Sequence, residues 1–147
     1  EVAVEDIPAG PGRTRLKPGE LIEAILLPPR GKSGGDAYLR FIPRSEMDIA
    51  VVGVAVSLTL DGGKVSAARV AIGAVAPTVL LVPEAAKAII GTTLDASAQA
   101  ALASAVSSAA TPISDKRGTV EFRKDVVGVL ARRAALIAYE RAKGAAK

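Results

Sequence analysis

Two carboxylates in the first third of the chain could carry acid–base chemistry. Glu46 and Asp48 stand close together in the sequence, and Arg44 flanks them. A carboxylate pair can supply a general acid and a general base when its surroundings drive the two pKa values apart. The neighbouring residues here predict no such shift. We therefore expect Asp48 to cap or bracket the start of the valine-rich strand that follows it.

A consecutive serine, aspartate and lysine form a second cluster that could carry out chemistry. Ser114, Asp115 and Lys116 could serve as a serine–lysine site of a small hydrolase. The sequence around them lacks the glycine-framed turn of a nucleophile elbow, and nothing predicts an oxyanion hole. Residues 114–117 are more typical of the turn that begins the last helix.

A glycine-rich segment could in principle bind phosphate. Gly31, Lys32 and Ser33 resemble the end of a P-loop, which requires another glycine five positions earlier and a helix directly afterwards. The earlier position is Leu26, and the glycines at 34–35 disfavour an immediate helix. We therefore expect a flexible loop over residues 30–36 and no nucleotide site.

The composition excludes several classes of site. The 147 residues contain no histidine and no cysteine, which removes imidazole bases, thiolate nucleophiles, their metal-site chemistry and disulfides. The lack of cysteine fits a cytoplasmic location, which we expect. The apolar runs 49–60 and 65–82 are interrupted well short of a bilayer span, so no transmembrane helix is predicted. Because the chain begins with Glu1 and its only methionine is Met47, we expect a processing or fragment boundary at its start.

Positive charge is concentrated near the C-terminus. Residues 116–147 hold nine Lys/Arg against three Asp/Glu, a surplus of six, whereas the whole chain has a net charge of +4. Aromatic residues make up only 3% of the chain, and no stacking platform accompanies the charge, so nucleic-acid binding is disfavoured. A solvated helix face explains the surplus better.

The elements that must position these residues follow from the pattern of apolar and turn-forming residues. Residues 1–20 are rich in Pro and Gly and predict an extended lead-in, and residues 21–27 predict a first strand. Residues 37–42 predict a second strand, in which Arg40 shares a face with Tyr38 and Ile42. Residues 50–60 and 65–75, separated by an Asp-Gly-Gly-Lys turn, predict a hairpin, and Pro77 closes the sheet.

Helical patterns fill the second half of the chain. A first helix is expected from Pro83 to just before Gly91, a second over 98–110 after a cap at Asp95 or Ser97, and a third over 119–143. The predicted buried stripe of the third helix comprises Phe122, Val126, Val129, Leu130, Ala134 and Ile137. The last three residues, 145–147, are expected to fray. Strands followed by helices predict a two-layer α+β domain, an antiparallel sheet covered on one face by about three helices.

Three sequence blocks carry a resemblance to a known family. They are residues 44–52 (RSEMDIAVV), residues 71–78 (AIGAVAPT) and residues 112–123 (PISDKRGTVEFR), in this order around the hairpin. Together they resemble the C-terminal domain of the FAD-binding subunit of molybdenum hydroxylases, the family of aerobic carbon monoxide dehydrogenase and xanthine dehydrogenase. The segments GPGRT at 10–14 and LKPGELI at 16–22 look like the family's connection from its flavin-binding domain. The resemblance implies a lead-in at 1–20 and a C-terminal-like domain at 21–147.

The resemblance also implies cofactors and partners. In this family, electrons from a molybdenum centre pass through [2Fe-2S] clusters to FAD, whose glycine-rich binding loops precede the C-terminal domain. Those loops are absent from this sequence, so we expect no FAD on this domain alone. Ile22 and Arg40 match places where the family's domain approaches the flavin ring, and they are the candidate cofactor-binding residues. The implied partners are a FAD-binding N-terminal domain, an iron–sulfur subunit and a molybdenum subunit.

Without the resemblance, the two candidate residues have ordinary explanations. Ile22 would belong to the core, and Arg40 would be a strand residue whose head reaches solvent. The alternative function is a stand-alone module for dimerisation or protein interaction, because sheet-and-helix domains also serve this role and could form homo-oligomers. Neither function gives this chain a catalytic centre of its own.

Overall fold

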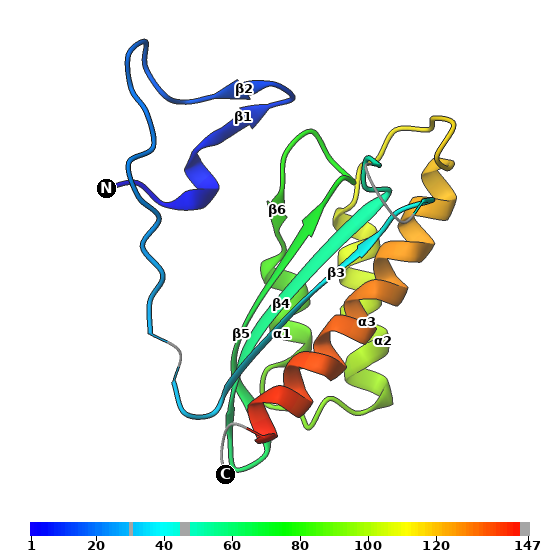
Figure 1. Cartoon of the computed structure of the whole chain (residues 1–147). Coiled ribbons are helices and arrows are strands. Elements are labelled where there is room, and N and C mark those ends of the chain that lie inside the picture. Colours follow the sequence, from blue (N-terminus) through cyan, green and yellow to red (C-terminus); the bar gives the residue numbers. More distant parts are fainter. Residues whose placement is uncertain (30, 45–47, 145–147) are drawn as a thin grey trace.

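A four-stranded antiparallel sheet forms one layer of the domain. The computed structural model describes residues 1–29, 31–44 and 48–144. The sheet has the order β3 (Gly34–Phe41), β4 (Val52–Asp61), β5 (Lys64–Gly73) and β6 (Leu80–Leu81) (Figure 1). β6 is a short edge strand after Pro77, so the expectation that Pro77 closes the sheet is wrong. The backbone regains an extended course there and pairs Leu80 with Ile72.

The central hairpin confirms the prediction from the sequence. β4 and β5 pair in antiparallel register around Gly62 and Gly63, which have φ angles of 56° and 81°. Glycine adopts this left-handed backbone without the steric penalty of a side chain. In β4, Val54, Val56 and Leu58 point into the core and alternate with more accessible residues. The valine-rich alternation therefore places one face of the hairpin under the helices.

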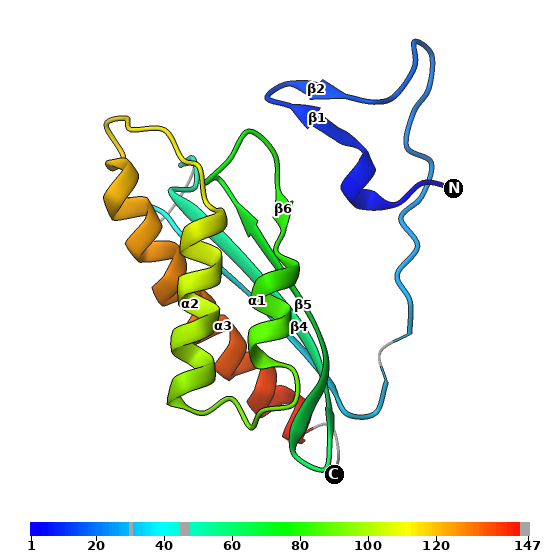
Figure 2. The same cartoon turned by 180° about the vertical axis from the view of Figure 1, so that it is seen from behind.

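Three helices cover that face. They are α1 (Pro83–Ile89), α2 (Ala96–Ala109) and α3 (Val120–Gly144), and α3 lies over β3 and β4 (Figures 1 and 2). α1 begins with Pro83 as predicted, and Gly91, with φ of 84°, follows its end. The Asp95 carboxylate accepts a hydrogen bond from the Ala98 N–H and caps α2. The predicted two-layer α+β architecture is confirmed.

The buried face of α3 differs from the predicted stripe. Leu130 and Ala134 are buried as expected, but Phe122 and Ile137 are 42% and 37% exposed. The buried residues of α3, which pack against the sheet and α2, are mostly small: they are Arg123, Val127, Gly128, Leu130, Ala131, Ala134, Ala135, Ala138 and Ala142. A helix that lies close to a sheet has room only for short side chains. Side-chain size, rather than hydrophobicity, therefore determined which side of α3 is buried.

Residues 1–29 form an arm on the side of the sheet opposite α2 and α3 (Figures 1 and 2). The arm contains a 3₁₀ turn, η1 (Val4–Asp6), and a small hairpin of β1 (Pro8–Gly10) and β2 (Arg13–Thr14), where the sequence predicted no regular structure. Residues 21–27, predicted as a strand, form none. A strand needs a neighbour to satisfy its backbone groups, and this segment does not pair with the sheet.

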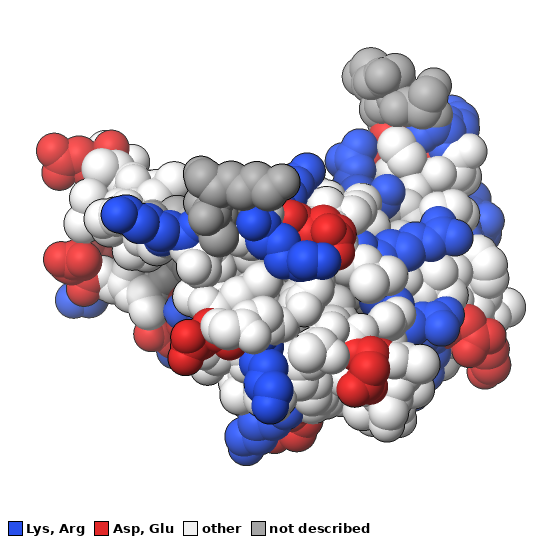
Figure 3. Space-filling model, turned by 90° about the horizontal axis from the view of Figure 1, so that it is seen from below, with Lys and Arg blue, Asp and Glu red and all other residues white. Residues whose placement is uncertain are grey.

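Charged side chains are scattered over the surface of the domain. Figure 3 shows Lys and Arg side chains interspersed with Asp and Glu and with a larger area of other residues. Arg132 and Arg133 of α3 are both exposed, as predicted for a solvated helix face. No helix in the part of the chain that the structure describes is long and apolar enough to cross a membrane. The predicted fraying at 145–147 lies outside the described residues.

The close approach of α3 to β3 predicts the effect of a single methyl group. A Cβ on Gly35 would overlap the Ala138 carbonyl oxygen and lie 2.6 Å from the Ala142 nitrogen. Since these are backbone atoms, Gly35→Ala should lower the free energy of unfolding by about 3 kcal/mol, measured by urea denaturation. Gly73→Ala is the matched strand control, because its new Cβ would only touch Val79 at 3.6 Å. Equal stability of the two variants would contradict the close packing.

Candidate functional site

Arg40 lies where the sequence placed it, in the strand β3. This strand forms one edge of the sheet, and Arg40 pairs with Gly53 of β4. Ala37, a neighbour on the opposite face, is buried under the helices, whereas Arg40 and Tyr38 are exposed. Because side chains alternate along a strand, Arg40 points from the face that the helices leave open.

The open face of the sheet is built mainly from small residues. On this face, β4 carries Gly53 and Ala55, which pair with Gly73 and Ala71 of β5. A Cβ built on Gly53 would lie 3.0 Å from the Tyr38 hydroxyl, so the tyrosine ring lies across that glycine. The result is a strip of small residues with Tyr38 and Arg40 at one margin.

Ile22 is placed differently from the prediction. It lies on the arm outside any strand, 56% exposed, so it is neither a strand residue nor a core residue. It lines an open hollow of about 970 Å³ formed by apolar parts of the arm, with Leu21, Ile25 and Leu26. Arg40 does not line this hollow. The structure therefore does not bring the two candidate residues into one pocket.

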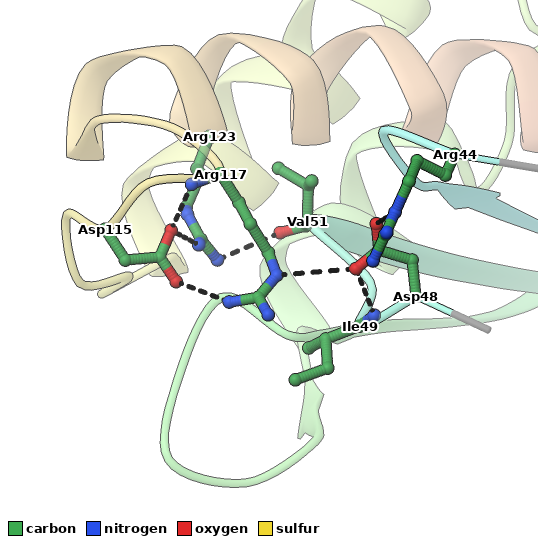
Figure 4. A network of polar contacts seen from close by, with 7 residues as sticks. All are labelled: Arg44, Asp48, Ile49, Val51, Asp115, Arg117 and Arg123. Atoms are coloured by element: carbon green, nitrogen blue, oxygen red, sulfur yellow. Dashed lines mark hydrogen bonds and ion pairs between the residues drawn. The ribbon is translucent and has the colours of Figure 1, made fainter.

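A buried arginine at the start of α3 was missed by the sequence analysis. Arg123 is only 4% exposed and lies between the helix and one end of the sheet (Figure 4). Its Nη1 donates to the carbonyl oxygens of Val51 and Ala74, both at 3.2 Å, and its Nη2 donates to Asp115 at 2.6 Å. Its Nε has no hydrogen-bond partner among the described residues. Arg123 thus joins α3 to the start of β4 and the end of β5.

The network extends from Asp115 to the loop before β4. Arg117 contacts Asp115 at 3.2 Å and Asp48 at 3.7 Å, and Arg44 donates to Asp48 at 2.9 Å (Figure 4). The Arg44 hydrogen bond, aided by the Ile49 N–H, holds the pKa of Asp48 below its usual value. The Arg117 N–H and the Arg123 guanidinium likewise lower the pKa of Asp115. Both aspartates are structural anions.

The other candidate clusters perform local structural roles. Ser114 Oγ accepts a hydrogen bond from the Val120 N–H, and Asp115 and Gly118 close a tight turn, as expected before α3. Gly31 and Gly34 form a turn that leads directly into β3, so the helix that a P-loop requires does not follow. Glu46, the other carboxylate of the predicted acid–base pair, lies outside the described residues.

The sequence of this domain matches a known protein family. The family model for the CO dehydrogenase flavoprotein C-terminal domain matches residues 37–138, which span β3 to most of α3. The chain belongs to this family. The sequence resemblance is thereby confirmed, and the polar network lies within the CO dehydrogenase flavoprotein C-terminal domain.

Alignments with related proteins also cover residues outside 37–138. Carbon monoxide dehydrogenase medium chain of Afipia carboxidovorans is 40% identical over 99% of this chain and 49% of that protein. The putative xanthine dehydrogenase FAD-binding subunit of Escherichia coli K12 is 29% identical over 90% of this chain and 46% of that protein. The chain spans about half the length of the curated relatives it matches.

Solved structures show the same fold. The reconstituted CO dehydrogenase from Oligotropha carboxidovorans matches with a TM-score of 0.88 and 36% identity, over 95% of this chain and 49% of that chain. The carbon monoxide dehydrogenase from Hydrogenophaga pseudoflava also gives 0.88, with 30% identity over 93% of this chain and 47% of that chain. These structural matches therefore cover much of the arm as well as the sheet and helices.

Removal of the Arg123 side chain should destabilise the whole domain. Arg123→Ala leaves the Val51 and Ala74 carbonyl oxygens without this donor and opens a cavity under α3. We expect the free energy of unfolding to fall by about 3 kcal/mol, measured by urea denaturation followed by circular dichroism. Arg132→Ala, on the exposed side of the same helix, should change it by less than about 0.5 kcal/mol. A similar loss in both variants would contradict the role of Arg123.

The network also predicts how stability depends on pH. Because folding lowers the pKa of Asp48 and Asp115, the unfolded chain takes up protons first as the pH falls. The stabilisation is present at pH values above the unfolded-state pKa of aspartate, about 4, and is lost progressively below it. Urea midpoints between about pH 6 and pH 3 should fall less steeply for Asp115→Asn than for the unaltered chain. If the urea midpoints of the two proteins fall equally with pH, Asp115 does not cause the pH dependence.

Proposed function

We propose that this chain is the C-terminal domain of a FAD-binding subunit in a molybdenum hydroxylase. The observation that carries the proposal is the joint match of sequence and fold to medium and FAD-binding subunits, over about half their length. The domain would complete the flavin site and dock the subunit onto iron–sulfur and molybdenum partners. In this proposal, residues 1–20 form the lead-in from the flavin-binding half and residues 21–147 form the C-terminal domain.

In this proposal, the open face of the sheet forms one side of the flavin site. The strip of glycine and alanine beside Tyr38 could pack against a planar ring, and Arg40 supplies a cation at its margin. Ile22 offers an exposed aliphatic side chain on the arm. Among the described residues no glycine-rich loop precedes a helix in the manner of a pyrophosphate site, so the remainder of the site must come from another part of the assembly.

The proposed roles of Arg40 and Ile22 follow from their chemistry. Bound FAD would supply the electron-accepting group, which side chains of ordinary amino acids cannot replace. The guanidinium of Arg40 would stabilise negative charge on the ring, since a fixed cation is most effective where water is excluded. Ile22 would pack against the ring and shield it from water. Arg40 is thus proposed as an electrostatic contact and Ile22 as a packing contact.

The proposed partners and location follow from the same assignment. Electrons would reach the flavin from iron–sulfur clusters in one partner, with substrate oxidation at molybdenum in another. We place the assembly in the cytoplasm, supported by the absence of cysteine-based disulfides in the chain. Fractionation of cells that produce the tagged chain would test the location, and recovery with the periplasmic fraction would contradict it.

Reconstitution tests the proposed function. The chain is mixed with the flavin-binding half, and flavin absorbance and electron transfer to an acceptor dye are measured. We expect the chain to increase both signals, because it closes one side of the flavin site. If neither changes and light scattering shows a self-associated chain, the interaction-module alternative is favoured.

Substitution of Arg40 tests its role within the same complex. Arg40→Ala should lower the flavin midpoint potential by on the order of 30 mV, because the reduced anion loses a nearby cation. Arg40→Lys should largely restore the potential. Lys64→Ala, at the exposed start of β5, removes an equal charge and should leave the potential unchanged. Equal potentials in all four proteins would remove Arg40 from the flavin site.

A further inference from the structure

In the part of the chain that the structure describes, β3 is the one long strand at an edge of the main sheet. The order β3-β4-β5-β6 leaves one side of β3 and one side of β6 without a neighbouring strand. β6 contains two residues, whereas β3 contains eight. A long edge strand presents N–H and C=O groups that can pair with a strand of another molecule, and a very short one presents few. Pairing with another molecule is therefore most favourable at β3.

The hydrogen bonds between β3 and β4 show which backbone groups of β3 point out of the sheet. The Ser33 carbonyl oxygen accepts from the Leu60 N–H at 3.0 Å, in line with the register that the two strands keep along their length. Residues of an antiparallel strand alternate between those that bond to the neighbouring strand and those that do not. The odd-numbered residues of β3 therefore bond to β4. The backbone groups of Asp36, Tyr38 and Arg40 point away from it.

A side chain of α3 occupies one of these outward groups. Arg141 Nη1 donates to the backbone carbonyl oxygen of Asp36 at 2.7 Å, although the two residues are 105 positions apart in the sequence. Arg141 is exposed and lies in the last turn of α3. Because the donor is charged, this hydrogen bond is stronger than one between neutral groups. The guanidinium thus stands where the N–H of an added strand would have to approach.

The end of α3 that carries Arg141 is fixed to the sheet by its neighbours. The backbone of Ala142 lies so close to Gly35 that a Cβ on this glycine would be 2.6 Å from the Ala142 nitrogen. The Tyr139 hydroxyl donates to the Gly63 carbonyl oxygen at 2.6 Å, in the turn between β4 and β5. These contacts hold the helix end over β3. Arg141 therefore needs to order only its own side chain to reach the edge.

The outward residues of β3 are complementary to a second copy of themselves. Antiparallel pairing centred on Tyr38 would place Asp36 of one copy opposite Arg40 of the other, with both side chains on the open face. Opposite charges at directly opposite positions stabilise an antiparallel pair. Such a two-fold contact uses the long edge of each copy and leaves only the short β6 edges, so it closes as a dimer. A second copy is therefore the partner that this edge fits.

We infer that Arg141 prevents β3 from pairing with β3 of a second copy. Its guanidinium occupies the Asp36 carbonyl oxygen, which in the dimer would accept the Arg40 N–H of the other copy. A side chain that only attached α3 to β3 would affect the stability of the domain and leave its association unchanged. The inference goes beyond the proposed function and does not depend on it, because it concerns contacts between copies of this chain.

Sedimentation velocity of the complete chain and of its Arg141 variants tests the inference. We expect Arg141→Ala to form a dimer at a concentration at least about tenfold below any self-association of the unaltered chain, because one more hydrogen bond per edge becomes available. Arg141→Met keeps the aliphatic length without the donors and should also dimerise. Arg141→Lys keeps a donor and should stay largely monomeric. Arg132→Ala removes an equal charge from an exposed position of the same helix and should remain a monomer.

A nitroxide label at position 38 locates the contact. The chain has no cysteine, so Tyr38→Cys can be labelled uniquely. In the Arg141→Ala dimer the two labels should broaden the electron paramagnetic resonance spectrum, since hydrogen-bonded partners in antiparallel strands lie about 5.5 Å apart at their Cα atoms. The same label in the chain that retains Arg141 should give no broadening. A label at Ala101→Cys, on the exposed side of α2, should give none in the dimer either.

Three results would overturn the inference. They are Arg141→Ala and Arg141→Met chains that fold, by circular dichroism, and stay monomeric; an unaltered chain that dimerises as strongly as these variants; and a dimer whose labels at position 38 show no broadening. A proline at the centre of the edge gives a further check. Tyr38→Pro removes an N–H that points away from β4, so its combination with Arg141→Ala should restore the monomer. A dimer that persists in this double variant would contradict pairing through β3.

Discussion

The buried guanidinium of Arg123 is the interaction on which the arrangement of this domain depends. A charge that is 4% exposed is tolerated only where acceptors surround it. The carbonyl oxygens of Val51 and Ala74 and the Asp115 carboxylate meet this requirement. These groups come from the start of β4, the segment after β5 and the loop before α3. One side chain therefore fixes the end of the sheet against the helix and the loop, and Arg117 extends the connection to Asp48.

Small residues then determine how α3 lies on the sheet. Gly35 allows the backbone of Ala138 to approach β3, and the rest of this helix face is largely alanine. A face this shallow cannot accommodate phenylalanine, which explains why Phe122 lies at the margin against Phe41. The opposite face of the sheet is not covered by α1, α2 or α3.

Local sequence patterns predicted where helices and strands form better than they predicted which neighbours surround each residue. The hairpin could be identified because valine alternates along both strands and glycines occupy the turn, and α2 because Asp95 caps it. Residues 21–27 have equally suitable side chains, but a strand also requires a partner, which no local pattern reveals. Arg123 could not be recognised as buried, because an isolated arginine normally indicates a solvated position. Two of its three acceptors, the Ala74 and Val51 carbonyl oxygens, come from residues 49 and 72 positions away.

The separation of the two exposed surfaces has a consequence for assembly. Arg40 and the arm lie on the open side of the sheet, whereas Phe41 and Phe122 lie on the helical side. In the proposed assembly, these two sides would be free to contact different partners. Rigid connection through Arg123 would still keep the two partners in a fixed relative orientation, because the domain has one continuous core between them. For electron transfer between cofactors held by different chains, a fixed orientation is useful in itself. In the proposed assembly, the domain would contribute by holding the geometry in which its partners react.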